Sequence, residues 1–160
     1  MSRAYLSLGS NIGNRQRAVS EMLRMLEHAP GVRLVKASSN YETRPVGWQD
    51  QPLFINAAAV IETTLDPMEL LRLAKEIEER LGRVDRGRWG PREADMDIVM
   101  FEDLVADLPE LTIPHPEMHL RRFVLAPLCE ISPDAVHPGL KKTIRQFLEE
   151  LGDRDYVIKQ

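Results

Sequence analysis

The sequence predicts an α+β fold: a ferredoxin-like βαββαβ plait with additional C-terminal helices and short strands, in a single domain of residues 1–160. Segments with strand-like and helix-like apolar patterns follow one another in the order β-α-β-β-α-β, which builds a mostly antiparallel sheet with both helices on one face. The chain is long enough to bury a core of its own. No internal repeat or flexible linker interrupts it.

The first half of the chain supplies three strands and one helix. Residues 4–8 alternate in a strand-like way and end at a small polar loop. Residues 15–27 form the predicted first helix, capped by Asn14, and its apolar face consists of Ala18, Met22, Met25 and Leu26. Residues 32–40 and 53–63 are rich in β-branched and small residues, which favours strands.

A long loop, residues 41–52, joins these two strands and carries two prolines and a Gly-Trp pair. The signals for a second helix follow: Asp66 as the cap, Pro67 at the first helical position and Glu69 three residues after the cap. Gly82 is placed to end this helix. Its predicted core face consists of Leu70, Leu73, Ala74, Ile77 and Leu81.

The second half of the chain completes the plait and adds further elements. A basic loop, residues 82–92, leads into a strand over residues 95–101, and a short strand should follow the next turn. Pro116 is predicted to start a helix that runs to residue 128, and Thr143 is predicted to cap a final helix. The stretch after Asp134 carries no functional signal and is expected to serve packing.

Composition limits the partners. The net charge of −4 provides no broad basic field, so we expect neither nucleic acid nor a membrane surface as a partner. No apolar stretch approaches the roughly 18 residues of a membrane span. The single cysteine, Cys129, cannot form an internal disulfide. We therefore expect a cytoplasmic protein, and a monomer.

Two carboxylates lie two residues apart on the last strand of the plait. Asp95 and Asp97 should point to the same face, with α-carbons roughly 6.5 Å apart. Magnesium prefers a few carboxylates together with waters and phosphate oxygens. The pair therefore suits a magnesium–phosphate site, although an isolated D-x-D is more often a solvated strand face.

Five arginines precede the acid pair: Arg80, Arg83, Arg86, Arg88 and Arg92. A guanidinium group donates two parallel hydrogen bonds to phosphate and stays charged at any working pH. Some of these arginines must form ion pairs with the neighbouring acids. We assign a phosphate-binding role to Arg83, Arg88 and Arg92.

Other candidates lie further from the acid pair. His115, between two prolines, and Arg121 are placed to donate to phosphate oxygens. His119 and His137 have no comparable context and are expected at the surface. Aromatic rings with a nearby amide can hold a flat heterocycle, and the candidates for such a pocket are Phe54, Trp89, Phe123 and Asn56.

Taken together, these residues resemble the 6-hydroxymethyl-7,8-dihydropterin pyrophosphokinase family of folate biosynthesis, from Tyr5 to about Pro133. The similarity rests on five ordered blocks: Leu8-Gly9-Ser10-Asn11, Tyr41-Glu42-Thr43 with Pro45, Gln51-Pro52-Leu53-Phe54-Ile55-Asn56-Ala57, Arg88-Trp89-Gly90-Pro91-Arg92 followed by Asp95-Met96-Asp97-Ile98, and Pro114-His115-Pro116 leading to Arg121-Arg122-Phe123-Val124-Leu125.

The resemblance implies transfer of the β,γ-pyrophosphoryl group of ATP to the hydroxymethyl group of the dihydropterin. It implies that Asp95 and Asp97 hold two Mg²⁺ ions and act in catalysis with Arg83 and Arg92. The residues that match the family's nucleotide contacts are Glu78, Arg83, Arg88, Trp89, Arg92, Ile98, His115 and Arg121. Those that match its pterin contacts are Thr43, Pro45, Val46, Phe54, Asn56, Trp89 and Phe123.

The sequence departs from the family pattern mainly in the basic loop. Asp85 stands where many members carry a basic residue, the loop at residues 84–88 is about one residue short, and Ala94 replaces a larger aliphatic residue. These differences concern nucleotide affinity and loop closure, because such loops govern closure and product release.

Three rival functions remain open from the residues alone. A non-catalytic ligand-binding module on the same plait is the first alternative, but it leaves the acids and arginines without a role. An RNA-binding domain would present aromatics and a basic face on its central strands, where this chain has Asp95 and Asp97. A D-x-D sugar-nucleotide transferase would need a larger nucleotide-binding domain.

Overall fold

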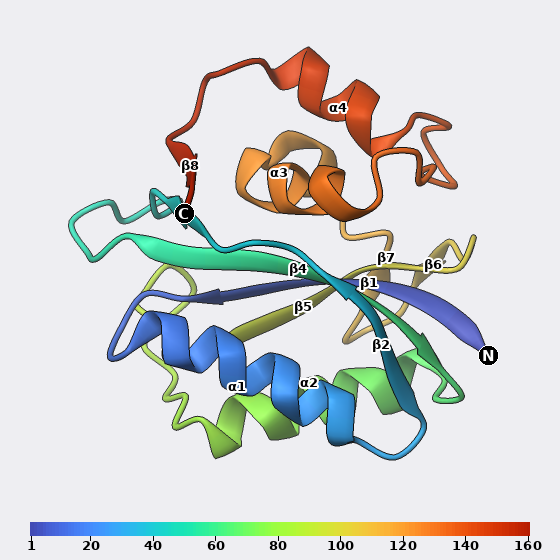
Figure 1. The fold of residues 1–160 in the computed structure, drawn as a ribbon, viewed down its shortest axis with the longest axis horizontal. Coiled ribbons are helices and arrows are strands. Elements are labelled where there is room, and N and C mark those ends of the chain that lie inside the picture. Colours follow the sequence, from blue (N-terminus) through green and yellow to red (C-terminus); the bar gives the residue numbers. More distant parts are fainter.

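The computed structural model describes all residues, 1–160, as a sheet between two layers of helices (Figure 1). Its strands are β1 (Ser2–Ser10), β2 (Val32–Ala37), β3 (Tyr41–Thr43), β4 (Phe54–Thr63), β5 (Asp95–Phe101), β6 (Ala106–Asp107), β7 (Thr112–Ile113) and β8 (Val157–Lys159). Its helices are α1 (Arg15–His28), α2 (Pro67–Arg80), α3 (Arg122–Ile131) and α4 (Ile144–Leu151), with a short 3₁₀ helix at Met118–Leu120. None of the helices combines the length and the apolar content needed to cross a membrane.

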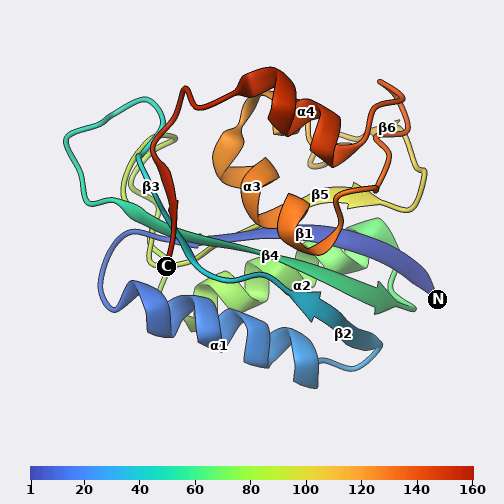
Figure 2. The same ribbon diagram turned by 45° about the horizontal axis from the view of Figure 1, so that its top comes forward.

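The main sheet is antiparallel and has the strand order β5-β1-β4-β3-β8, with β2 paired to the second half of β4. Helices α1 and α2 cover one face, and α3 and α4 lie over the other (Figures 1 and 2). The predicted combination of helices with an antiparallel sheet is confirmed.

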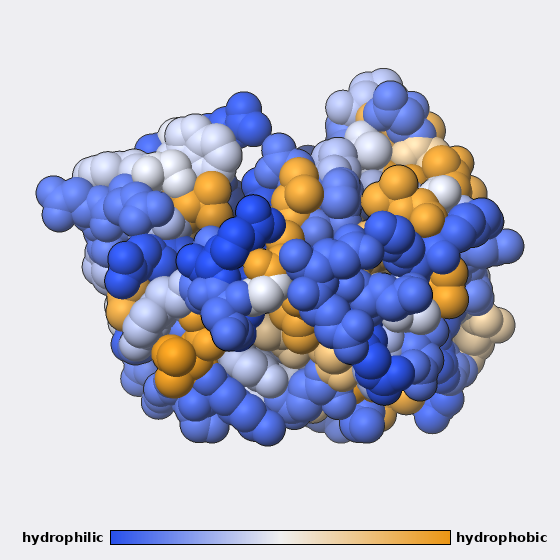
Figure 3. All heavy atoms as spheres, turned by 90° about the horizontal axis from the view of Figure 1, so that it is seen from above, coloured by the Kyte–Doolittle hydropathy of each residue, from blue (hydrophilic) through white to orange (hydrophobic).

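The sheet is buried on both faces because successive side chains of a strand point to opposite sides. In β4, Ala57, Ala59 and Ile61 pack in the core beneath α1 and α2, whereas Ala58 and Val60 pack beneath α3 and α4. The outward side of the α3–α4 layer is largely hydrophilic, with hydrophobic residues in separate patches (Figure 3). Both helix layers are therefore integral to the packing of one sheet.

The predicted starts of the first two helices are confirmed in detail. The Asn14 side chain accepts the Arg17 N–H at 3.1 Å. Asp66 accepts the Glu69 N–H at 2.8 Å, and Glu69 accepts the Asp66 N–H at 3.0 Å. Each cap satisfies backbone donors that have no partner inside the helix.

The predicted apolar faces of the first two helices are confirmed in part. Val19 was not assigned to the face of α1 but is buried, together with Met22 and Leu26, whereas Ala18 and Met25 are only partly buried. In α2, Leu70, Ala74 and Ile77 are buried, and Leu73 and Leu81 pack at the edge of the same core.

One expectation, about the long loop, was wrong, and one of the additional short strands was not located from the sequence. Residues 41–52 are not loop throughout, because Tyr41–Thr43 form β3. The stretch after Asp134 contains a strand, β8, which pairs with β3. Both strands have only three residues, and the hydrogen bonds that define them come from partners distant in sequence.

The predicted helix from Pro116 to residue 128 is divided in two. The N–H groups of residues 118, 120 and 121 donate to carbonyls three residues back, as in a 3₁₀ helix. Arg121 is extended, with φ −115° and ψ 101°, and α3 begins only at Arg122. His119 and His137 were expected at the surface, but both rings pack against Phe147, at centroid distances of 5.9 and 5.8 Å, and His137 is buried while His119 is partly buried.

We predict that Asp66→Ala lowers the free energy of unfolding by about 1 kcal/mol, because it removes the cap of α2. The melting temperature should fall by roughly 2–4 °C. Asp50→Ala is a matched control, because Asp50 is exposed and forms no side-chain hydrogen bond. Equal melting temperatures for the two variants would contradict the role of the cap.

Candidate functional site

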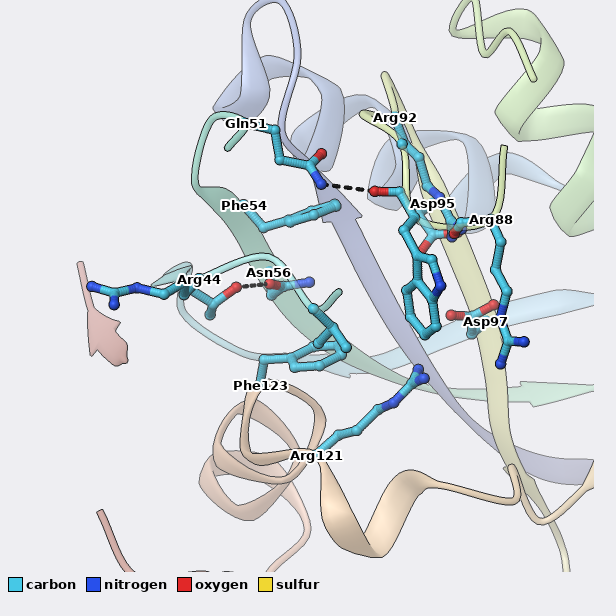
Figure 4. Close-up of a pocket in the computed structure, with 14 residues that line it drawn as sticks. Arg44, Gln51, Phe54, Asn56, Arg88, Arg92, Asp95, Asp97, Arg121 and Phe123 are labelled. Carbon is cyan, nitrogen blue, oxygen red and sulfur yellow. Dashed lines mark hydrogen bonds and ion pairs between the residues drawn. The ribbon is translucent and has the colours of Figure 1, made fainter. Parts of the chain in front are cut away.

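A pocket of about 140 Å³ lies at the end of the sheet where β3, β4 and β5 meet the start of α3 (Figure 4). Two loops close its rim, one before β4 and one before β5. Its lining consists of Thr43, Arg44, Val46, Gln51, Phe54, Asn56, Arg88, Trp89, Gly90, Arg92, Asp95, Asp97, Arg121 and Phe123.

Phe54 and Phe123 come from opposite sides of the pocket, and Asn56 lies between them (Figure 4). Asn56 is 5% exposed; its Nδ2 donates to the Leu8 carbonyl at 3.2 Å, and its Oδ1 accepts from the Thr43 hydroxyl. A primary amide has two N–H donors and two acceptor lone pairs, so one donor and one acceptor remain free. This arrangement suits a flat heterocycle with a donor–acceptor edge.

Asn56 depends on the absence of a side chain at Gly9. A Cβ atom on Gly9 would lie 2.6 Å from the Asn56 Nδ2, closer than atoms in contact can approach. Gly9 pairs with Asn56 across β1 and β4, and with Asp95 across β1 and β5. The end of β1 therefore adjoins both the amide and the acid pair.

The acid pair lies on β5 beside two of the predicted arginines. Asp95 Oδ1 accepts from Arg83 Nη1 and from Arg92 Nη1, each at 3.1 Å. Arg83 Nη1 also donates to Glu78 Oε2 at 2.6 Å, and Glu78 accepts the Met96 N–H. Burial and the charge of Asp95 raise the pKa of Glu78, although its hydrogen-bond donors act in the opposite direction.

Asp97 differs from Asp95 because its carboxylate forms no ion pair and accepts no hydrogen bond from the protein. Burial, together with the negative charges of Asp95 and Glu78, raises the pKa of Asp97. A largely buried carboxylate without a partner is costly. Two carboxylates with open coordination sites fit a magnesium ion, which takes a few protein oxygens and leaves the rest to waters and phosphate.

Two further cavities meet the pocket at the acid pair. One has a volume of about 670 Å³ and is lined by Glu78, Arg83, Arg88, Arg92, Asp95 and Asp97 among others. The other, of about 330 Å³, is lined by Asp97, Ile98 and His115. Asp97 is the one residue that lines all three cavities.

His115 has a defined tautomer in this setting. Its Nδ1 accepts the Glu117 N–H at 3.2 Å, so the neutral ring carries its proton on Nε2. Burial and the charge of Arg121 lower the pKa of His115. The ring can therefore donate one hydrogen bond from Nε2 while it remains neutral.

The buried side chain of Asn11 joins the two rim loops. Its Nδ2 donates to Gln51 Oε1 at 2.8 Å, and its Oδ1 accepts the Arg92 N–H at 2.8 Å. Gln51 Nε2 donates in turn to the Trp89 carbonyl at 2.7 Å (Figure 4). The Trp89 indole packs over Gly47, where a Cβ atom would lie 2.7 Å from the ring.

The structure brings together most of the residues predicted from the sequence, but in three cavities. Of the seven expected pterin contacts, only Pro45 does not line the first pocket; it lines a groove beside it. Of the expected nucleotide contacts, Arg121 lies on the pocket side, where its guanidinium stacks on Phe123 at 5.6 Å.

Sequence reasoning missed Arg44 and Gln51 as pocket residues. Gln51 opens one of the five sequence blocks and was a recognisable signal. Arg44 had none, because exposed arginines in loops are common.

The chain matches the family model described as 7,8-dihydro-6-hydroxymethylpterin-pyrophosphokinase over residues 5–133. It is 48% identical over 128 residues to the 2-amino-4-hydroxy-6-hydroxymethyldihydropteridine pyrophosphokinase of Bacillus subtilis, covering 80% of this chain and 77% of the relative. The protein of the same name from Methylorubrum extorquens is 44% identical over 94% of both chains. The Schizosaccharomyces pombe protein "Folic acid synthesis protein fol1" is 43% identical over 92% of this chain, which spans 20% of that protein.

A solved structure with a similar fold is that of wild-type Plasmodium falciparum HPPK-DHPS with pteroate. It superposes with a TM-score of 0.76 at 18% identity, over 93% of this chain and 42% of that one. This chain thus spans less than half of that protein, and the likeness concerns the fold.

We predict that Asp97→Asn stabilises the metal-free protein. The folded state binds a proton at Asp97 more tightly than the unfolded chain, so ionisation of this carboxyl lowers stability as the pH rises from its ordinary value through the raised one. Asparagine resembles the protonated acid. The stabilising effect of the substitution should be absent near pH 4 and grow toward pH 8. At pH 8 the melting temperature of Asp97→Asn should be a few degrees above that of the native protein, because each kcal/mol corresponds to roughly 2–4 °C.

Thermal unfolding in EDTA at both pH values would measure this effect, with the exposed Asp103→Asn as the control. A melting temperature for Asp97→Asn that is below that of the native protein at pH 8 would contradict the prediction.

Proposed function

Because the chain belongs to the 7,8-dihydro-6-hydroxymethylpterin-pyrophosphokinase family, we propose that it transfers the pyrophosphoryl group of ATP to the hydroxymethyl group of 6-hydroxymethyl-7,8-dihydropterin, releasing AMP. The observation that carries the proposal is the position of Asp97, which lines all three cavities. A metal held there would lie between an acceptor in the small pocket and a nucleotide in the larger space.

The small pocket suits the pterin. Phe54 and Phe123 would stack on its two faces, and the free donor and acceptor of Asn56 would bind its edge. Thr43 fixes the orientation of Asn56. The remaining pterin contacts proposed are Val46, Trp89 and, at the edge of the pocket, Pro45.

The larger cavities suit the nucleotide. Arg83, Arg88 and Arg92 would neutralise its phosphates, and the neutral His115 would donate from Nε2 to a phosphate oxygen. Ile98 would contact the apolar part of the nucleotide, and the other contacts proposed are Glu78, Trp89 and Arg121. Asp85 accepts the Gly87 N–H in the basic loop, and it lowers the positive charge there.

Phosphoryl-type transfer depends mainly on positioning and on neutralisation of charge. Asp95 and Asp97 would hold Mg²⁺, two ions in our proposal, which would neutralise phosphate charge and lower the pKa of the attacking hydroxyl group. Arg83 and Arg92 are already fixed on Asp95, so they need little reorganisation to contact phosphate. No side chain stands out as a general base.

Three broader expectations remain part of the proposal. The strand order β5-β1-β4-β2 supports the ferredoxin-like plait as the description of residues 1–101. Because one sheet carries both helix layers, we treat residues 1–160 as one domain. A cytoplasmic monomer that binds neither nucleic acid nor membrane remains a prediction from composition.

The decisive experiment measures AMP formation from ATP and Mg²⁺ with and without 6-hydroxymethyl-7,8-dihydropterin. Pterin-dependent AMP should form with the native chain and fall by at least about 100-fold in Asp97→Ala, because the metal site is lost. Asp103→Ala, which changes an exposed acid in a turn, should retain activity. Absence of AMP from the folded native protein would favour the alternative, a non-catalytic ligand-binding module.

We also predict that Phe54→Ala raises the KM for the pterin about tenfold, because it removes roughly 1.5 kcal/mol of stacking and apolar contact. The KM for ATP in the same variant should change less than twofold and serves as the internal control. Equal increases for both substrates would contradict the separate placement of pterin and nucleotide.

A further inference from the structure

The chain after α4 runs back along the sheet to the pterin side of the site. We name residues 153–160 the C-terminal strap. Its strand β8 pairs only with β3, with Val157 opposite Thr43 and Lys159 opposite Tyr41. Figure 2 shows the C-terminal strand beside β3 at the edge of the sheet. The strap lies outside the residues matched by the family model, which end at residue 133.

The strap holds the rim loop before β4, residues 44–53, through Tyr156. This loop is called the rim loop below. The Arg44 N–H donates to the Tyr156 carbonyl at 3.3 Å, and the Arg44 guanidinium lies 5.5 Å from the centre of the Tyr156 ring. The Tyr156 hydroxyl donates to Glu42 Oε1 at 3.3 Å. In Figure 4 the Arg44 side chain points away from the pocket, so its guanidinium contacts the strap while its backbone continues into the loop that carries Val46.

The strap also contacts the start of α3. Arg122 Nη1 donates to the Asp155 carbonyl at 2.8 Å, and Arg122 directly precedes Phe123. A groove of about 480 Å³ separates the strap from the rim loop, and Val46, Phe123 and Tyr156 are among the residues that line it. The strap is thus joined to three parts of the pterin pocket: β3, the rim loop and the start of α3.

We propose that the C-terminal strap is a positioning element for the pterin, with Tyr156 as its main positioning residue. This inference rests on the proposed function. In the rim loop before β4, Arg44 and residues 46–50 are exposed, and only Pro45 between them is buried. An anchor at Arg44 restricts the conformations of this loop before the pterin binds, so less ordering is required on binding. Without the anchor, the fraction of protein that is competent for binding falls and the apparent affinity falls with it.

The test is Tyr156→Ala, examined in the full chain by pterin binding and by steady-state kinetics. The Kd and KM for 6-hydroxymethyl-7,8-dihydropterin should rise about threefold to tenfold, since the variant loses the stacked cation and the hydroxyl contact. The Kd for ATP with Mg²⁺ and the kcat at saturating pterin should stay within twofold. Tyr156 is 38% exposed, so the substitution opens no cavity in the core.

Three comparisons separate positioning from a general loss of structure. Tyr156→Phe keeps the ring and should restore most of the affinity. Ile158→Ala changes an exposed residue of the same strand and should leave the affinity unchanged. In Arg44→Gln combined with Tyr156→Ala, the two increases in Kd should not multiply, because both remove the same contact.

The outcomes distinguish this inference from the function on which it rests. Native protein that binds no pterin overturns the proposed function. If the native protein and Tyr156→Ala bind pterin equally tightly, the role of the strap is overturned and the proposed function is not affected. The role of the strap would also be overturned if Tyr156→Ala lost affinity for pterin and ATP equally. The same holds if the Ile158→Ala control lost as much pterin affinity as Tyr156→Ala.

Discussion

The burial of Asp97 against two other carboxylates is the constraint on which the rest of the site depends. Glu78 and Asp95 are both bridged by Arg83, and Arg92 adds a second cation to Asp95. These arginines leave the Asp97 carboxyl without an ion-pair partner, so the negative charge that it carries when ionised is not compensated where three cavities meet. A cation is the natural complement of that charge, and a polyanionic substrate brings such a cation with it.

The fold tolerates this unfavourable placement of the Asp97 carboxyl because the strand that carries the two aspartates is held firmly. β5 pairs with β1, β1 pairs with β4 over its whole length, and both faces of this sheet are covered by helices. The loops around the site have no such support. The candidate metal-binding carboxylates thus lie on a strand, whose position is fixed, whereas the residues of the surrounding loops are largely exposed.

Local signals in the sequence predicted the local structure well. The caps at Asn14, Asp66 and Thr143 are short-range motifs, and each begins a helix as expected. The acid pair was placed correctly because a strand alternates with a period of two. The strands β3 and β8 were missed because they are defined by pairing with partners distant in sequence. The division of the helix after Pro116 was missed because it depends on a single extended residue.

The same distinction applies to the site. Phe54, Asn56 and Phe123 were found through motifs, and the structure places them around one pocket. Arg44 and its contact with Tyr156 join residues more than 100 positions apart, which no spacing rule connects.

The two rim loops have one more property in common. The chain contains two tryptophans, Trp48 and Trp89, and one lies on each loop. Both indoles are partly exposed, and no tryptophan lies in either core. The tryptophan emission of this protein therefore originates entirely at the rim of the site, so tryptophan fluorescence records the state of the two loops without a constant background from tryptophans in the interior.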